Sequence, residues 1–379
     1  MKILVLGVNG FIGSHLAGRI IRDTEWEIYG MDLSCDRLGE KVHHSRVNFI
    51  EGDISVNKEW IEYHVKKCDV CLPLVAIATP ATYVRDPLSV FELDFEQNLR
   101  IVRQCAQYGT RVIFPSTSEV YGMCNDDEFN EETSNLTYGP INKQRWIYAC
   151  AKQMMDRVIW AMGIHKGLKF TLIRPFNWIG PGLDSLSTPK EGSSRVVTQF
   201  LGNILRGEPI TLVDGGEQRR CFTYVDDGLD CLMKIIENKD NCCDGKIFNI
   251  GNPMNDYSIR ELAETMLDIL EEFSKLLPSS IKKGIDENIN ELYLNFVSPS
   301  GHWQNKYKFK EISGKEFYGT DYQDVNYRVP DITNAINILG WKPKVSLKEA
   351  LRLTIASYLQ DTDFYPERLY SVISPEQGK

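Results

Sequence analysis

Lys2-Ile3-Leu4-Val5-Leu6-Gly7-Val8-Asn9-Gly10-Phe11-Ile12-Gly13 is the most informative stretch of this 379-residue chain. The apolar run Lys2–Gly7 predicts a strand, and the helical spacing of apolar residues from Phe11 to Arg22 predicts a helix after it. Glycines in the turn between them let backbone N–H groups approach a pyrophosphate, and the helix N-terminus supplies partial positive charge. This motif predicts a dinucleotide site made of Gly7, Asn9, Gly10, Phe11, Ile12 and Gly13.

An acidic residue ends the second predicted strand, Glu27–Asp32. The Asp32 carboxylate is expected to accept hydrogen bonds from the adenosine ribose hydroxyls, and its charge would repel a 2′-phosphate. We therefore predict NAD as the cofactor in preference to NADP, with nearby Arg37 as the one feature that points the other way.

Strand and helix patterns alternate through the first half of the chain. Further strands are predicted at Val47–Ile50, Val70–Leu74, Arg111–Ser116 and Phe170–Pro175, with long helices at Phe91–Tyr108 and Trp146–Met162. This alternation predicts an α/β fold with a Rossmann-type, doubly wound parallel sheet.

The pattern loosens after residue 178, where glycine and proline become frequent. We expect an NAD-binding domain over 1–178 and a smaller C-terminal α/β substrate domain over 179–379. The second domain is expected to contain an irregular insertion near 274–315 and, after Gln360, a loosely held tail.

Composition excludes several classes of protein. The formal net charge of −9 argues against a nucleic-acid-binding protein. The longest apolar stretch, Val70 to Ala78, is too short to span a bilayer, and the N-terminus has no cleavable signal pattern.

Cys68 and Cys71, three apart on a strand, would point to opposite faces, so neither a shared metal nor a disulfide is expected. The ten cysteines are read as thiols of a cytoplasmic protein without a metal site.

Tyr148 and Lys152 are four residues apart, so they share one face of a predicted helix. A lysine ammonium beside the phenol is expected to lower the tyrosine pKa, so that the phenolate can accept a proton from a sugar hydroxyl. Glu119 lies in an earlier segment rich in hydroxyl groups, Ser116 to Tyr121, and suggests a second proton-transfer group.

The glycine spacing resembles that of the extended short-chain dehydrogenase/reductase superfamily. The resemblance implies a third catalytic hydroxyl, Thr117 or Ser118, and a late strand at Ile247–Ile250 that returns to the first domain. It also implies that Asp53 and Ile54 bracket the adenine. The cofactor floor would be lined by Leu74, Ala76 and Ala78.

Several motifs narrow the resemblance: Leu74-Val75-Ala76-Ile77-Ala78-Thr79-Pro80, Thr117-Ser118-Glu119-Val120-Tyr121-Gly122, Lys143-Gln144-Arg145-Trp146-Ile147-Tyr148, Arg174-Pro175-Phe176-Asn177-Trp178, Asp214-Gly215-Gly216 and Tyr322 to Pro330. They look like those of UDP-glucuronate decarboxylases, most closely the decarboxylase halves of bifunctional polymyxin-resistance proteins. Plant UDP-apiose/UDP-xylose synthases share Trp146, Tyr148 to Gln153 and Phe317-Tyr318-Gly319.

The decarboxylase resemblance implies roles for individual residues. Glu119 would be the proton acceptor and Arg328 the proton donor, while Tyr148 and Lys152 would serve the redox step. Contacts with the UDP-sugar would come from Ala78, Tyr83, Thr117, Ser118, Arg145, Asn177, the stretch Thr211 to Arg220, and Tyr322. Within that stretch, Arg219 and Arg220 are both expected to clamp the diphosphate.

The expected reaction is oxidation of UDP-glucuronate at C4 by NAD⁺, followed by loss of C6 as CO₂. The resemblance favours release of the resulting UDP-4-keto-pentose. Its reduction to UDP-xylose is an alternative, and no motif separates these outcomes. Apiose synthesis, a nucleotide-sugar 4,6-dehydratase, a 4-epimerase and an inactive NAD-sensing regulator remain alternatives. The resemblance also implies a homodimer formed through the helices Phe91–Tyr108 and Trp146–Met162, whose apolar residues Ile147, Met154, Met155, Val158 and Ile159 could equally be core.

Overall fold

The computed structural model describes residues 1–186, 195–206, 208–276, 309–320 and 322–360. Its main sheet has seven parallel strands in the order β11-β6-β5-β4-β1-β2-β3. These strands are β1 (Lys2–Leu6), β2 (Glu27–Asp32), β3 (Val47–Glu51), β4 (Val70–Pro73), β5 (Arg111–Pro115), β6 (Phe170–Pro175) and β11 (Lys246–Ile250). The predicted Rossmann-type fold is confirmed, and the segment expected to form a late strand lies beside β6.

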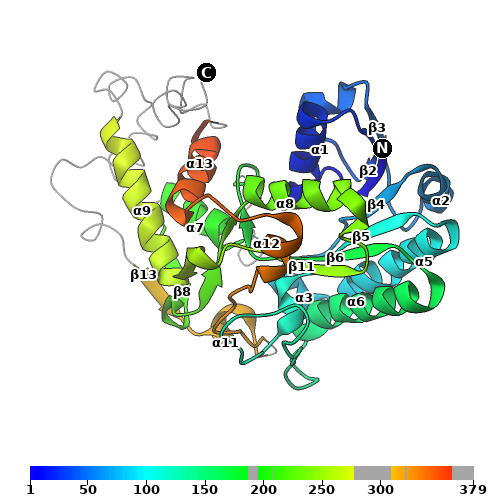
Figure 1. Cartoon of the computed structure of the whole chain (residues 1–379). Helices are drawn as coiled ribbons and strands as arrows, with labels where there is room; N and C mark the ends of the chain where they lie inside the picture. The colour runs from blue at the N-terminus through cyan, green and yellow to red at the C-terminus, as the bar shows by residue number, and fades with distance from the viewer. Residues whose placement is uncertain (187–194, 207, 277–308, 321, 361–379) are drawn as a thin grey trace.

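Helices cover both faces of this sheet (Figure 1), with α1 and α8 on one face and α2, α5 and α6 on the other. The α-helices are α1 (Phe11–Asp23), α2 (Lys58–Lys67), α3 (Pro80–Arg85), α4 (Pro87–Phe91), α5 (Asn98–Tyr108), α6 (Trp146–Lys166), α7 (Val196–Leu205), α8 (Val225–Glu237), α9 (Ile259–Leu276), α11 (Gly314–Tyr318), α12 (Thr333–Leu339) and α13 (Leu347–Gln360). Short helical turns are η1 (Gly39–His43), the π-helical turn η2 (Glu92–Gln97), η3 (Ser118–Tyr121), η4 (Asp214–Gly216), η5 (Lys239–Asn241) and η6 (Pro253–Asn255).

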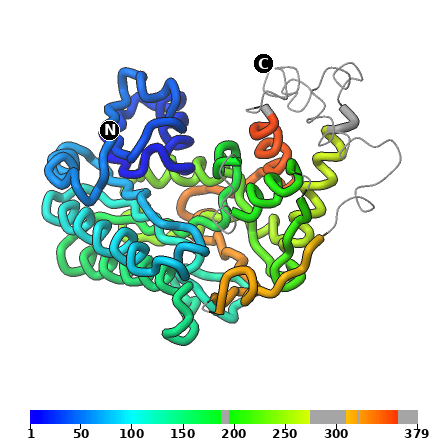
Figure 2. The backbone as a smooth tube through the Cα atoms, turned by 180° about the vertical axis from the view of Figure 1, so that it is seen from behind, coloured from blue at the N-terminus to red at the C-terminus, as the bar shows by residue number. Residues whose placement is uncertain are grey.

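The C-terminal part carries the remaining strands in three two-stranded sheets. They are β7 (Trp178–Ile179), β8 (Ile210–Val213), β9 (Arg219–Cys221), β10 (Thr223–Tyr224), β12 (Asp256–Ser258) and β13 (Phe309–Ile312). Figure 2 shows this part, in green to orange, beside the blue and cyan N-terminal part of the chain. One buried apolar cluster joins Leu16 of α1 and Leu232 of α8 to Met266 of α9 and Leu351 of α13, so the core continues across the boundary expected at residue 178.

Two expectations need correction or restriction. The predicted helix Phe91–Tyr108 is interrupted by η2, whose wider turn directs Asp94 into the protein. Most of the expected insertion, residues 277–308, and the tail 361–379 lie outside the described residues. The end of that insertion is not irregular, because β13 pairs in parallel with β8 and is followed by α11.

The sheet order brings the ends of β1 and β4 together, at the point where successive strands are added in opposite directions. Leu74 N–H donates to Leu6 O at 2.7 Å, so the loop after β4 lies against the glycine turn after β1. In doubly wound sheets, ligands bind at this crevice beyond the carboxyl ends of the strands.

Candidate active site

A pocket of about 290 Å³ lies between the carboxyl end of the main sheet and the C-terminal part of the chain. Of the predicted catalytic and substrate residues, those that line it are Ala78, Tyr83, Thr117, Glu119, Arg145, Tyr148, Asn177, Arg220, Tyr322 and Arg328. These residues come from segments spread over most of the chain, so the fold, not local sequence, brings them together.

The glycine turn fits a dinucleotide. Gly7 has a φ of +89°, and a Cβ on Gly13 would lie 2.4 Å from Gly7 O. Gly10 begins α1 without a side-chain cap, which leaves backbone N–H groups of the first turn free for an anion. The Asp32 carboxylate accepts the N–H groups of Asn9 at 2.7 Å and Leu33 at 2.8 Å, which fixes it at the end of β2.

Replacing Gly13 by alanine tests this close approach. The new Cβ would meet backbone oxygens of Gly7 and Val8, so Gly13→Ala should weaken NAD⁺ binding at least tenfold and lower the melting temperature. Gly18→Ala in the same helix is the control, because its Cβ would meet only the flexible end of Lys41. Titration calorimetry and thermal melts measure both; equal NAD⁺ affinity of the two variants would contradict the assignment.

The other expected cofactor residues follow β3 and β4, at the carboxyl ends of these strands. Asp53 is exposed, and its carboxylate accepts Ser55 N–H at 2.7 Å. Ile54 is buried in the core, whereas Leu74 and Ala76 follow β4 and are half-buried. The bracketing of the adenine by Asp53 and Ile54 stays a prediction.

The Tyr148 ring is buried and stacks on Tyr83, with 4.7 Å between centroids and 7° between planes. Burial raises the pKa of Tyr148, and the nearby carboxylates of Asp94 and Glu119 act in the same direction, while a hydrogen bond with Thr117 lowers it. The pKa of Tyr148 is therefore raised, and the expected lowering by Lys152 is wrong for this structure.

Lys152 instead forms a buried ion pair, with its Nζ 3.3 Å from Asp94 Oδ1 and 3.1 Å from Pro115 O. Asp94 Oδ2 also accepts Ile77 N–H at 2.9 Å, which ties the lysine to the loop after β4. Sequence analysis missed Asp94, which is buried within the π-helical turn η2 and whose partner Lys152 lies on a different helix.

The structure distinguishes between the two candidate catalytic hydroxyls, those of Thr117 and Ser118. Thr117 lines the pocket, and its Oγ1 accepts Glu119 N–H at 3.2 Å. Ser118 is buried and is not among the residues that line the pocket. Thr117 is therefore the hydroxyl beside Tyr148.

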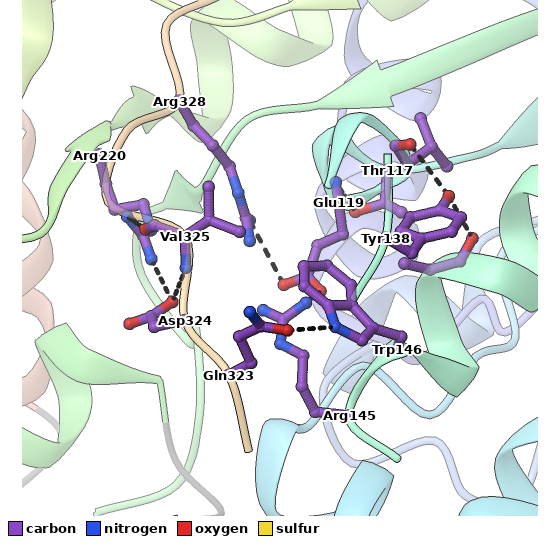
Figure 3. A network of polar contacts seen from close by, with 12 residues as sticks. Thr117, Glu119, Tyr138, Arg145, Trp146, Arg220, Gln323, Asp324, Val325 and Arg328 are labelled. Atoms are coloured by element: carbon purple, nitrogen blue, oxygen red, sulfur yellow. Dashed lines mark hydrogen bonds and ion pairs between the residues drawn. The ribbon is translucent and has the colours of Figure 1, made fainter. Parts of the chain in front are cut away.

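Glu119 lies between two buried arginines (Figure 3). Its Oε2 is 3.0 Å from Arg145 Nη1, and its Oε1 is 3.3 Å from Arg328 Nη1. Burial raises the pKa of Glu119, but the charges of Arg145 and Arg328 outweigh it and hold the pKa below its usual value. Burial lowers the pKa of Arg328. The site thus holds an ionised carboxylate between two guanidinium groups.

Arg219 and Arg220 do not both face the pocket, which corrects the expected double clamp. Arg219 is 39% exposed and bonds to Asp256 at 2.8 Å and Glu261 at 3.2 Å, outside the pocket. Arg220 lines the pocket, where its Nη2 lies 2.8 Å from Asp324 Oδ1. Adjacent side chains on a strand point to opposite faces, so the alternation along β9 was a signal that only one of the two arginines faces the pocket.

Two further substrate candidates have distinctive conformations. Asn177 has a positive φ of 38°, which is uncommon outside glycine and typical of functional sites. The Tyr322 ring stacks on Tyr318 at 3.9 Å and lies 5.5 Å from the Arg145 guanidinium. Tyr318 and Asp324 also line the pocket. Sequence analysis quoted both within motifs, Phe317-Tyr318-Gly319 and Tyr322 to Pro330, but gave neither a role in the site.

Comparison with known proteins agrees with this geometry. Residues 3–251 match the model of the NAD dependent epimerase/dehydratase family. The chain belongs to this family. Its expected NAD dependence and its grouping with enzymes of the extended short-chain dehydrogenase/reductase type are thereby confirmed.

Three solved structures illustrate the similarity. The PbgP3 protein from Burkholderia pseudomallei is 56% identical, with a TM-score of 0.79, and the match covers 94% of this chain and 96% of that one. UDP-glucose 4-epimerase from Thermotoga maritima, solved with UDP-glucose, is 24% identical, with a TM-score of 0.71 and coverage of 96% and 100%. UDP-glucuronic acid 4-epimerase from Bacillus cereus, solved with UDP-glucuronic acid and NAD, is 20% identical, with a TM-score of 0.72 and coverage of 95% and 99%. The last two establish the shared fold only.

The described residues contain no helix that is both long and apolar enough to cross a membrane. They also contain no group of three or more histidine, cysteine, aspartate or glutamate side chains arranged to hold a metal ion.

Proposed function

We propose that this enzyme is an NAD-dependent UDP-glucuronate decarboxylase, which oxidises C4 of the sugar and then releases C6 as CO₂. The observation that carries the proposal is the ion pair between Glu119 and Arg328, 209 positions apart, in the same pocket as Tyr148. Oxidation at C4 needs one base at the hydroxyl. Decarboxylation also needs a cation that binds the carboxylate and a proton for C5. The Glu119–Arg328 pair can supply both.

For the redox step we assign Tyr148 as the base that accepts the proton of the C4 hydroxyl, with Thr117 bonded to the same phenol. NAD⁺ would lie along the glycine turn, where it supplies the hydride acceptor and a positive ring that lowers the pKa of a nearby phenol. Lys152, held by Asp94, adds a second positive charge behind the tyrosine ring at 5.9 Å.

For the decarboxylation step we assign Arg328 as the donor of the proton that C5 takes up after CO₂ leaves. Glu119 is assigned as the proton acceptor that takes over the proton Tyr148 received from the C4 hydroxyl and returns it to Arg328, so no net proton is gained or lost. The C4 ketone is β to the C6 carboxylate, so CO₂ can leave while the new carbonyl takes up the electron pair as an enolate. Arg145 and Arg328 can hold the carboxylate before it leaves. The two guanidinium groups keep Glu119 ionised. A 4,6-dehydratase would be expected to carry an aspartate where this chain has Ser118, which argues against that alternative.

We further propose that Arg220 binds the diphosphate and that Ala78, Tyr83, Asn177 and Tyr322 contact the UDP-sugar. A homodimer is proposed through α6, on which Met155 and Ile159 are core, whereas Met154 is 49% and Ile164 66% exposed. The ten free thiols support a reducing, cytoplasmic location.

Incubation of the purified protein with UDP-glucuronate and NAD⁺ tests the proposal. Absorbance at 340 nm reports NADH, and mass spectrometry reports the sugar products. We expect loss of CO₂ with equimolar NADH and a UDP-4-keto-pentose. Loss of CO₂ without net NADH would assign UDP-xylose or UDP-apiose synthesis instead. Absence of CO₂ release would contradict the decarboxylase assignment, and a sugar product that keeps its C6 would assign an epimerase or dehydratase.

A further inference from the structure

Asn249, on the late strand β11, is fully buried and bonds three separate segments with one carboxamide. Its Oδ1 accepts the Tyr121 hydroxyl at 2.8 Å. Its Nδ2 donates to Phe129 O at 2.7 Å and to Asp331 O at 3.0 Å. The side chain therefore uses both of its donors, which are expensive to leave unpaired inside a protein.

These three contacts hold the segments that carry Glu119 and Arg328. Tyr121 closes the turn η3, which also contains Glu119. Phe129 and Asp331 belong to a short backbone ladder, in which Phe129 N–H donates to Val329 O at 2.7 Å and Asp331 N–H donates to Phe129 O at 3.0 Å. Arg328 directly precedes Val329 of this ladder. Asn249 is therefore bonded to the segment that carries Glu119 and to the segment that carries Arg328.

The same network reaches the helix of the redox residues. The Tyr121 hydroxyl accepts Arg174 Nη1 at 2.9 Å, and Arg174 Nη2 lies 3.2 Å from Asp156 Oδ2. Asp156 lies on α6, one turn after Lys152, and also accepts the Ser116 hydroxyl at 2.8 Å. The positions of the Tyr148 helix and of the Glu119 turn are thus linked through buried polar contacts.

Asn249 does not line the pocket, so it cannot act on the substrate directly. The ion pair alone would not fix the relative position of the two groups, because a substrate carboxylate competes with Glu119 for Arg328. A misplacement of about 1 Å at a reacting group can cost on the order of 100-fold in rate. A rigid connection between the two segments is therefore needed while the substrate carboxylate binds and leaves.

We propose that Asn249 is a positioning residue that sets the separation of Glu119 and Arg328 and so controls the CO₂-releasing stage. Its role in that stage rests on the proposed function. We call the three side-chain hydrogen bonds of Asn249, to Tyr121, Phe129 and Asp331, the Asn249 clamp. This clamp is a property of the fold that can be measured without substrate.

Asn249→Leu tests the proposal, because leucine has the same number and branching of side-chain heavy atoms and makes none of the three bonds. Asn252→Leu is the matched control: Asn252 is also buried, and its carboxamide bonds Val345 O at 3.1 Å and Met254 N–H at 3.0 Å, away from the ion pair. Tyr121→Phe removes the hydroxyl that donates to Asn249 and accepts from Arg174, and it leaves both donor bonds of Asn249 in place. It serves as a second variant if Asn249→Leu fails to fold.

Amide hydrogen exchange of the apo protein is the first readout. We expect Asn249→Leu to speed exchange at Phe129 and Asp331 at least tenfold, with no such change in Asn252→Leu. The second readout compares the NADH formed in a single turnover with the CO₂ released. Asn249→Leu should lower the rate of CO₂ release about 10- to 100-fold, with the KM for UDP-glucuronate and the NADH burst within about threefold of wild type. Tyr121→Phe should give a smaller effect of the same kind.

Unchanged exchange at Phe129 and Asp331 in the Asn249 and Tyr121 variants would overturn the clamp. Equal losses of NADH formation and CO₂ release would overturn its specific role in the second stage. If wild-type protein releases no CO₂, the proposed function fails, while the exchange experiment still decides whether Asn249 holds the two segments.

Discussion

Replacing Tyr148 by phenylalanine is expected to lower kcat for NAD⁺ reduction by about 10³-fold, since a positioned general base contributes roughly 10²- to 10⁴-fold. The phenyl ring keeps its stacking on Tyr83, so UDP-glucuronate and NAD⁺ affinities should change by no more than a few-fold. Stopped-flow absorbance at 340 nm and equilibrium binding measure the two quantities separately.

Tyr138→Phe is the matched control for that variant. The Tyr138 hydroxyl donates to Val120 O at 2.9 Å and Ala149 O at 3.2 Å, close to the same helix but away from the pocket. Loss of the Tyr138 hydroxyl should lower the melting temperature of the protein more than it lowers kcat for NAD⁺ reduction. A Tyr148→Phe enzyme that keeps more than a tenth of wild-type kcat would remove Tyr148 from the role of base.

Arg328→Met is expected to lower CO₂ release by about 10²- to 10⁴-fold, as is typical when a proton-transfer group is removed. The variant leaves Glu119 paired with Arg145 alone and deprives the substrate carboxylate of one cation. Oxidation at C4 should persist, so single turnovers should form NADH without matching CO₂. Because Arg328 is buried, a thermal melt must accompany the assay to show that the variant is folded.

Arg219→Met provides the control for loss of an arginine. Its guanidinium bonds Asp256 and Glu261 on the outer side of β9, so CO₂ release and the KM for UDP-glucuronate should stay within about threefold of wild type. A large rise in KM would show that Arg219 reaches the diphosphate after all. Equal NADH and CO₂ losses in Arg328→Met would contradict a role confined to the second stage.

Local sequence accounts for the cofactor half of the site. The glycine turn, the strand before it, the helix after it and Asp32 all lie within one β-α-β unit, so residue spacing alone predicts their arrangement. Tyr148 and Lys152 share a face of α6 for the same reason. Short-range periodicity is set by backbone geometry, which neighbouring residues are sufficient to determine.

The substrate half was less predictable from the residues themselves. Glu119 and Arg328 could be paired beforehand only through a family resemblance, because no spacing rule relates residues 209 positions apart. The inward turn of Asp94 depends on the π-helical turn η2, and the outward turn of Arg219 depends on the pairing of β9 with β12. Asn249 reads in the sequence as an ordinary residue of a late strand.

The sequence by itself determined the parallel α/β sheet, the dinucleotide turn and the tyrosine–lysine pair, since each follows from local periodicity. Only the tertiary structure decided which arginines face the pocket, which carboxylate holds Lys152 and how Arg328 is brought to Glu119. Those arrangements depend on burial: a charge taken out of water must find a partner, and that partner comes from whichever segment the fold places beside it.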